Sequence, residues 1–173
     1  MIASALSFLL LGSTEEPKKL DGLKFQGIQY LHRNSEGNLH EFTPKEQPNL
    51  EKWTDMVTIN DYPSVTTGEA LAKGANGVLD AYKGARGMIV RATSVPRTEK
   101  KEAEHLIVAL FIRQEYAEAA FARFLMVEGK GLSLVYSHRI YGKAPGKPLS
   151  EWLAKKGPQI EKSLMAIKEL PKR

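Results

Sequence analysis

The sequence predicts an α+β domain in which helices cover both faces of a mostly antiparallel sheet, a helix–sheet–helix sandwich. Two polar, glycine-containing stretches, residues 34–37 and 128–131, lie between strand-like segments and are typical of hairpin turns. The segment Leu106–Ile112 is apolar without alternation, which favours a strand buried on both faces. Residues 66–82 and 149–167 carry apolar side chains at helical spacing, so we expect two helical regions to supply the cover.

The first third of the chain reads as three strands. Leu23–Arg33 and Asn38–Thr43 form the arms of the first hairpin, around the turn at residues 34–37. Asn49 is placed to cap a short helical turn that ends at Trp53. Met56–Tyr62 then alternates apolar and polar side chains, which predicts a third strand. We expect Trp53 to be buried where the turn docks on the sheet.

A helix is expected next. Thr66 and Glu69 have the spacing of a capping box, in which the hydroxyl and the carboxylate each bond a backbone amide of the first turn. Apolar residues from Leu71 to Tyr82 follow along one face. Three further strands are expected. The first is Met88–Val95, and the other two, Ala119–Val127 and Leu132–Tyr141, form the late hairpin.

The C-terminal segment reads as a second helical region beginning near Leu149. Gly157 and Pro158 interrupt it, and Pro158 is expected to open a further helix at its first position. Residues 143–173 hold eight Lys or Arg against three Asp or Glu, a balance of +5 that equals the net charge of the whole chain. This basic end favours an acidic partner or, at most, peripheral membrane contact, although dispersed lysines are also typical of a solvated helix face.

The length of 173 residues suits one hydrophobic core. We therefore expect residues 20–173 to form a single domain behind a leader and polar linker at residues 1–19. The apolar run within Met1–Ser13 resembles the hydrophobic part of a secretory signal, although no basic residue precedes it. The prediction is a periplasmic or secreted protein, with a cytoplasmic one, whose N-terminal helix packs on the domain, as the alternative.

One stretch resembles a known family. Glu41-Phe-Thr-Pro44, followed by Leu50-Glu-Lys-Trp53-Thr-Asp-Met56-Val-Thr-Ile59, is similar to bacterial exported proteins of the PsbP-like superfamily. The same fold also occurs in a Ran-binding nuclear import factor. The resemblance implies a PsbP-like α+β domain with a binding or assembly role, and it carries no functional residue across, because the matching motif looks structural.

No catalytic motif stands out in the sequence. There is no Gly-x-Ser-x-Gly elbow, Walker loop or dinucleotide-binding glycine pattern. The absence of cysteine excludes disulfides and thiolate chemistry, and no pattern typical of nucleic-acid binding occurs. The four histidines lack metal-site spacing. With the first turn at residues 34–37, His32 and His40 are expected on opposite faces, so we predict no metal and no cofactor.

The late hairpin carries the one candidate site. With a turn at residues 128–131, Arg123 is expected to face Tyr136, and Phe121 to face His138. Arg123, Tyr136 and His138 would then share one face and could hold a small anionic or aromatic ligand. The alternative is that these side chains satisfy buried carboxylates or helix carbonyls.

These observations predict a non-enzymatic binding or assembly domain whose partner is a protein or a small anionic ligand. Two alternatives stay open. One is an enzyme whose site is assembled from scattered residues, and the other is an accessory domain tethered to a membrane by an uncleaved leader.

Overall fold

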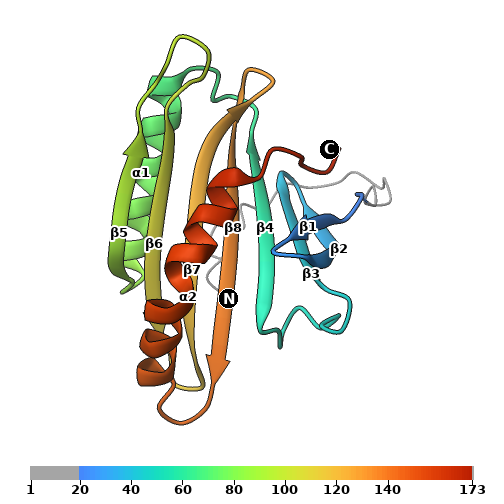
Figure 1. Ribbon diagram of the computed structural model, residues 1–173, viewed down its shortest axis with the longest axis vertical. Coiled ribbons are helices and arrows are strands. Elements are labelled where there is room, and N and C mark those ends of the chain that lie inside the picture. Colours follow the sequence, from blue (N-terminus) through green and yellow to red (C-terminus); the bar gives the residue numbers. More distant parts are fainter. Residues whose placement is uncertain (1–19, 173) are drawn as a thin grey trace.

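The computed structural model describes residues 20–172, so the expected leader at residues 1–19 lies outside the described residues. Ten elements follow one another within these described residues (Figure 1). The strands and helices, in order, are β1 (Leu23–Phe25), β2 (Ile28–Glu36), β3 (Leu39–Pro44), β4 (Asp55–Tyr62), α1 (Gly68–Gly84), β5 (Met88–Val95), β6 (Glu104–Ile112), β7 (Tyr116–Val127), β8 (Lys130–Tyr141) and α2 (Gly146–Ala166).

The eight strands form a single antiparallel sheet in the order β1-β2-β3-β4-β8-β7-β6-β5. Every neighbouring pair is antiparallel, and the pairing of β4 with β8 joins two sets of sequential strands. The strand Leu106–Ile112 was predicted to be buried on both faces, and all of its residues except Ile112 are buried.

The expected helix–sheet–helix sandwich is wrong. The described residues contain only two helices against eight strands, so the sheet and not a pair of helical layers dominates the fold. Helix α1 packs mainly on β5–β7 and α2 mainly on β7 and β8, while β1–β4 lack comparable helical cover (Figure 1). Aromatic side chains from the strands themselves close the core there, namely Phe25, Tyr30 and Phe42.

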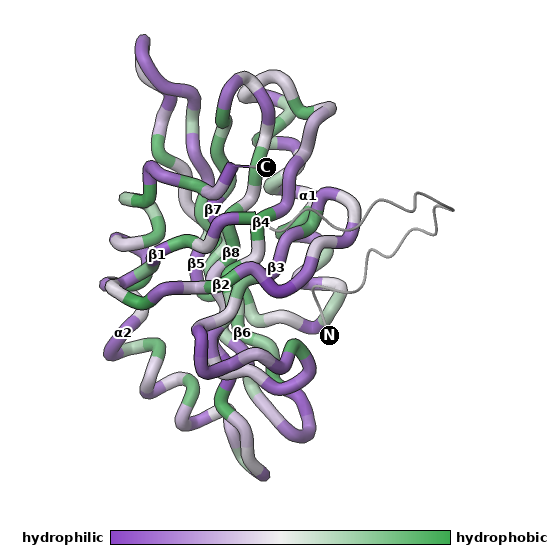
Figure 2. Tube along the Cα trace, turned by 90° about the vertical axis from the view of Figure 1, so that its right-hand side faces the viewer, coloured by the Kyte–Doolittle hydropathy of each residue, from purple (hydrophilic) through white to green (hydrophobic). Residues whose placement is uncertain are grey.

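The core is divided by the sheet. Leu149, Ile160 and Leu164 of α2 join the larger cluster, whereas Leu71 and Ala75 of α1 pack with Ile107 and Phe124 in a smaller one. Hydrophobic residues concentrate along the middle strands, and α2 alternates between hydrophobic and hydrophilic residues (Figure 2). This amphipathic pattern is typical of a helix that buries one face against a sheet.

Two predicted helix boundaries need correction. The N-cap of α1 is Thr67 and not Thr66, because the Thr67 hydroxyl accepts the amide hydrogen of Ala70 at 3.2 Å. Helix α2 runs unbroken through Pro158, so the expected second helix is wrong. One of the clashes a proline ring makes in a helix, that with the Cβ of the preceding residue, is absent because this residue is Gly157.

Both hairpin turns are tighter than expected. The late turn is Glu128–Gly129, whose φ angles of 50° and 76° are typical of a two-residue type I′ turn. The first turn likewise contains two residues, Gly37 and Asn38, between the paired residues Glu36 and Leu39. Each expected four-residue turn was therefore too long, and the strand registers built on them change accordingly.

Candidate functional site

The three predicted site residues share one face but do not form one cluster. Arg123 pairs with Leu134 and not with Tyr136, because the tighter turn shifts the expected register by two residues. An even shift keeps side chains on the same face. Arg123 and His138 nevertheless stand four strand positions apart in this ladder, which corresponds to roughly 13 Å. The expected pairing of Phe121 with His138 is wrong for the same reason, since Phe121 pairs with Tyr136.

Arg123 is held by internal partners. Its Nε and Nη2 donate to the two carboxylate oxygens of Glu104 at 2.9 and 3.0 Å. Its Nη1 donates to the carbonyl oxygens of Leu164 and Ile167, at the end of α2, at 2.9 and 2.8 Å. Both side chains of the ion pair are only 3% exposed. Arg123 therefore joins strand β6 to the C-terminal end of α2.

Tyr136 and His138 belong to a second centre built around Asp55. The Tyr136 hydroxyl donates to Asp55 Oδ1 at 2.7 Å, and His138 Nδ1 donates to the same oxygen at 2.9 Å. The His138 ring also stacks on the indole of Trp152 in α2, with centroids 3.9 Å apart and planes 5° from parallel. Gln47 Nε2 donates to the other carboxylate oxygen at 3.3 Å. We call Asp55, Tyr136 and His138 the Asp55 centre.

The Asp55 centre keeps its carboxylate ionised. Burial acts to raise the pKa of Asp55, but the hydrogen bonds from His138 and Tyr136, together with the charge of His138, outweigh it and hold that pKa below its ordinary value. Burial and the neighbouring carboxylate raise the pKa of Tyr136, so its hydroxyl stays protonated and donates. The donors that could hold an anion are therefore already bonded to an anion of the protein itself.

The sequence did not identify Asp55 as part of this site. Asp55 lies opposite His138 because β4 pairs with β8, and these strands are far apart in the chain. No local pattern could have shown that pairing. Binding of a ligand by Arg123, Tyr136 and His138 is not tested by the structure and stays a prediction, but their geometry fits the alternative of satisfied carboxylates and helix carbonyls.

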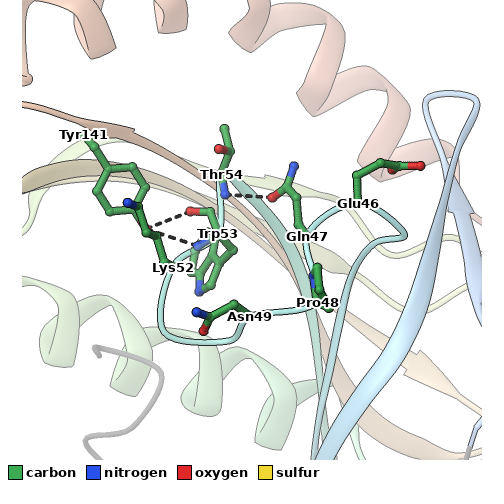
Figure 3. A pocket seen from close by; sticks show the side chains of 8 residues that line it. All are labelled: Glu46, Gln47, Pro48, Asn49, Lys52, Trp53, Thr54 and Tyr141. Carbon is green, nitrogen blue, oxygen red and sulfur yellow. Dashed lines mark hydrogen bonds between the residues drawn. The ribbon is translucent and has the colours of Figure 1, made fainter.

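A hollow is lined in part by Gln47, the residue that donates to Asp55 (Figure 3). It has a volume of about 380 Å³ and is lined by the loop between β3 and β4 and by the end of β8. Trp53 is 5% exposed, as its predicted burial requires, and its backbone amide and carbonyl both bond the Tyr141 hydroxyl, at 3.2 and 2.9 Å. Gln47 Oε1 accepts from the amides of Thr54 and Asp55, which orders the loop around the hollow.

The face of the tryptophan ring is occupied by a cation. The guanidinium carbon of Arg139 lies 3.8 Å from the centroid of Trp53 and 4.4 Å from that of Tyr116. Arg139 Nε donates to Glu118 at 2.8 Å. The aromatic wall that a ligand in the hollow would use is thus partly taken by a side chain of the protein.

Three further findings bear on function. Within residues 20–172, no three His, Asp or Glu side chains gather closely enough to hold a metal ion. The helices described there are too short or too polar to cross a membrane. Comparison with known proteins shows that no family model and no curated protein matches this chain.

Proposed function

We propose that this chain is an exported binding or assembly domain that recruits an extended segment of a partner protein along strand β5. The observation that carries the proposal is the open edge of the sheet. Strand β5 is the last strand of the sheet order, and among residues 20–172 it pairs with β6 alone. An unpaired edge presents backbone donors and acceptors that another strand can use.

The side chains of this edge also favour association. Met88, Val90 and Val95 are 61%, 47% and 49% exposed, and Ile112 on the neighbouring strand is 46% exposed. Apolar side chains on an open strand give a partner apolar contacts in addition to backbone hydrogen bonds. Burial of such side chains is worth roughly 25 cal/mol for each Å² removed from water.

The register of β5 limits where a partner can pair. The ladder with β6 shifts between Ile89 and Arg91, and such bulges disturb regular pairing. From Arg91 to Val95 the ladder is regular. We therefore place the backbone pairing of the partner along residues 91–95, where Val95 supplies an exposed apolar side chain, and Met88 and Val90 extend the apolar edge beyond it. The resemblance of residues 41–59 to the PsbP-like superfamily independently favours binding or assembly over catalysis.

Site-specific photo-crosslinking in the native host tests this proposal. A benzophenone side chain at Thr93, which is exposed on β5, should give a defined adduct with one partner protein. The same group at Lys73, exposed on α1, is the matched control and should give none. Val95→Lys should abolish the Thr93 adduct. Equal crosslinking at both positions, or none at Thr93, would exclude β5 as the binding edge.

The alternative of an enzyme has one specific observation in its favour. Outside the Asp55 centre, Ser35, His40 and Asp61 form a hydrogen-bonded series at the other end of the same face of the sheet.

A further inference from the structure

A bulge in β2 brings two histidines and a serine together. The register between β2 and β3 shifts between His32 and Asn34, so Arg33 is an extra residue in β2. One extra residue inverts the alternation of side chains beyond it. Ser35 therefore lies on the same face as His32, directly opposite His40. The expected placement of His32 and His40 on opposite faces is wrong, and their ring centroids are 6.4 Å apart.

Hydrogen bonds join these side chains in a continuous series. His32 Nε2 is 2.8 Å from Ser35 Oγ, and Ser35 Oγ is 2.7 Å from His40 Nδ1. His40 Nε2 is 3.2 Å from Asp61 Oδ2 on the adjacent strand β4. Asp61 lies at the end of the series, and the backbone amide of Leu20 lies at its start, 3.3 Å from His32 Nδ1.

The position of each proton follows from the ends of the series. Because Leu20 donates to His32 Nδ1, a neutral His32 carries its proton on Nε2 and donates to Ser35. The Asp61 carboxylate accepts, so a neutral His40 carries its proton on Nε2. His40 Nδ1 is then left as the acceptor for the Ser35 hydroxyl. The tautomers are thus assigned from the hydrogen-bond network.

We propose that Ser35 is a nucleophile for acyl transfer from small esters, with His40 as its general base and Asp61 as the residue that positions His40. An activated serine requires a base within hydrogen-bonding distance and a third group that orients the base. Ser35, His40 and Asp61 meet these requirements. This site is separate from β5, and the proposal does not depend on the proposed binding function.

The chemistry balances within these groups. The Ser35 hydroxyl proton passes to His40 Nδ1 while Oγ bonds to the ester carbonyl carbon, and the pair of electrons of the carbonyl moves to its oxygen. Collapse of this intermediate breaks the bond to the leaving alcohol, which takes the proton from His40. Water then attacks the acyl-serine with the same base, which releases the acid and restores Ser35. His32 Nε2 donates to Oγ and so orients the hydroxyl, whose own proton points to His40 Nδ1.

Partial exposure is compatible with this role. His40 and Asp61 have 12% and 26% of their side chains exposed, and Ser35 is intermediate in burial, close to the exposed hairpin turn. The base is therefore largely shielded from water, while Ser35 and Asp61 keep part of their surface exposed.

The molecule contains its own control. Ser94 Oγ lies 2.8 Å from His105 Nδ1, a separation close to that between Ser35 and His40. His105 Nε2, however, is buried without a hydrogen-bond partner among the described residues. In the part of the chain that the structure describes, no carboxylate orients this second histidine, and burial lowers its pKa. Ser94 should therefore be unreactive where Ser35 reacts.

The test uses the full-length chain and a fluorophosphonate probe, which phosphonylates activated serines. Peptide mapping of the wild-type protein should find the adduct on Ser35 and not on Ser94. His40→Gln should slow labelling by about 10²-fold, the usual contribution of a general base. Ser94→Ala should leave the rate unchanged. No adduct, or equal labelling of Ser35 and Ser94, would overturn the proposal in the wild-type molecule itself.

Asp61 needs a separate readout because it acts through His40. Asp61→Asn keeps the shape but presents an amide, which favours the wrong tautomer of His40. Labelling of Ser35 and hydrolysis of p-nitrophenyl acetate should both fall at least tenfold, with an unchanged melting temperature. Asp61→Glu should recover part of the rate. A labelling rate that is the same in Asp61→Asn as in wild type would show that Asp61 does not position the base.

Discussion

Arg123 and Arg139 lie on adjacent strands of one hairpin, yet they are stabilised in different ways. Both are buried and each pairs with a glutamate. Arg123 lies on the face covered by α2 and uses the fork of its guanidinium for hydrogen bonds to Glu104 and to two helix carbonyls. Arg139 lies on the other face, makes one bond to Glu118, and is enclosed by aromatic rings.

The difference reflects what each arginine has to hold in place. The last turn of α2 contains no basic residue, so its terminal carbonyls have no cation of their own. Arg123 supplies that cation from the sheet. Arg139 instead fixes a loop, because Trp53, which covers its guanidinium, lies between β3 and β4. Hydrogen bonds from Arg123 thus anchor helix α2, whereas stacking on Arg139 anchors the loop that carries Trp53.

The largest effect is expected when Arg123 is replaced by methionine. Removing one partner of a buried pair leaves the other charge uncompensated and costs about 3–5 kcal/mol. Glu104 would keep only its contact with Lys101, and the carbonyls of Leu164 and Ile167 would lose their donor. Urea unfolding measures the loss of stability.

A double variant separates charge from packing in this pair. Arg123→Met combined with Glu104→Met removes both charges, so it should recover part of the stability lost in the single variant. If the double variant is no more stable than Arg123→Met, the cost comes from the helix carbonyls rather than from Glu104.

A smaller effect is expected on the face of Arg139. Trp53→Ala removes a buried aromatic side chain, for which about 3–5 kcal/mol is typical. We expect the lower end of that range, because the hollow beside Trp53 lets water fill the space (Figure 3). Thermal and urea unfolding give the measurement. A melting temperature within about a degree or two of wild type would contradict the docking role of Trp53.

Local sequence patterns were sufficient for part of this structure. The buried strand Leu106–Ile112 follows from its composition, and the burial of Trp53 follows from its position between a turn and a strand. The shared face of Arg123 and His138 follows from alternation and survives a two-residue error in register. These features depend on neighbours in the chain.

The parts that the sequence did not predict depend on distant partners or on single inserted residues. The Asp55 centre requires the pairing of β4 with β8, which no turn between them specifies. The series through Ser35 requires the bulge at Arg33, since without it Ser35 would lie on the face opposite to His32. The predicted sandwich was wrong because side chains of the first strands, and not a helix, cover the core over the first half of the sheet.

The smallest expected effect is the response to acid, and it compares the Asp55 centre with the Arg123 pair. Burial acts to raise the pKa of Asp55 and of Glu104, but hydrogen bonds and charges from their partners lower both pKa values below their ordinary range. A carboxylate with a lowered folded-state pKa stabilises the fold above its unfolded pKa, and this contribution is lost as the pH falls through the folded value. Stability should therefore decrease below about pH 4.5.

Asp55→Asn and Glu104→Gln show how the two sites divide this response. Each variant should be less stable than wild type at neutral pH and should lose less stability between about pH 4.5 and pH 2, because one of the titrating carboxylates is gone. Urea midpoints measured across that range give the slopes. Since His138 and Tyr136 still donate to an amide oxygen at position 55, we expect Asp55→Asn to fold and to keep the stacking of His138 on Trp152. If the stability of Asp55→Asn falls with pH in parallel with that of wild type, Asp55 titrates alike in the folded and unfolded chains. The acid sensitivity would then come from Glu104 in its pair with Arg123.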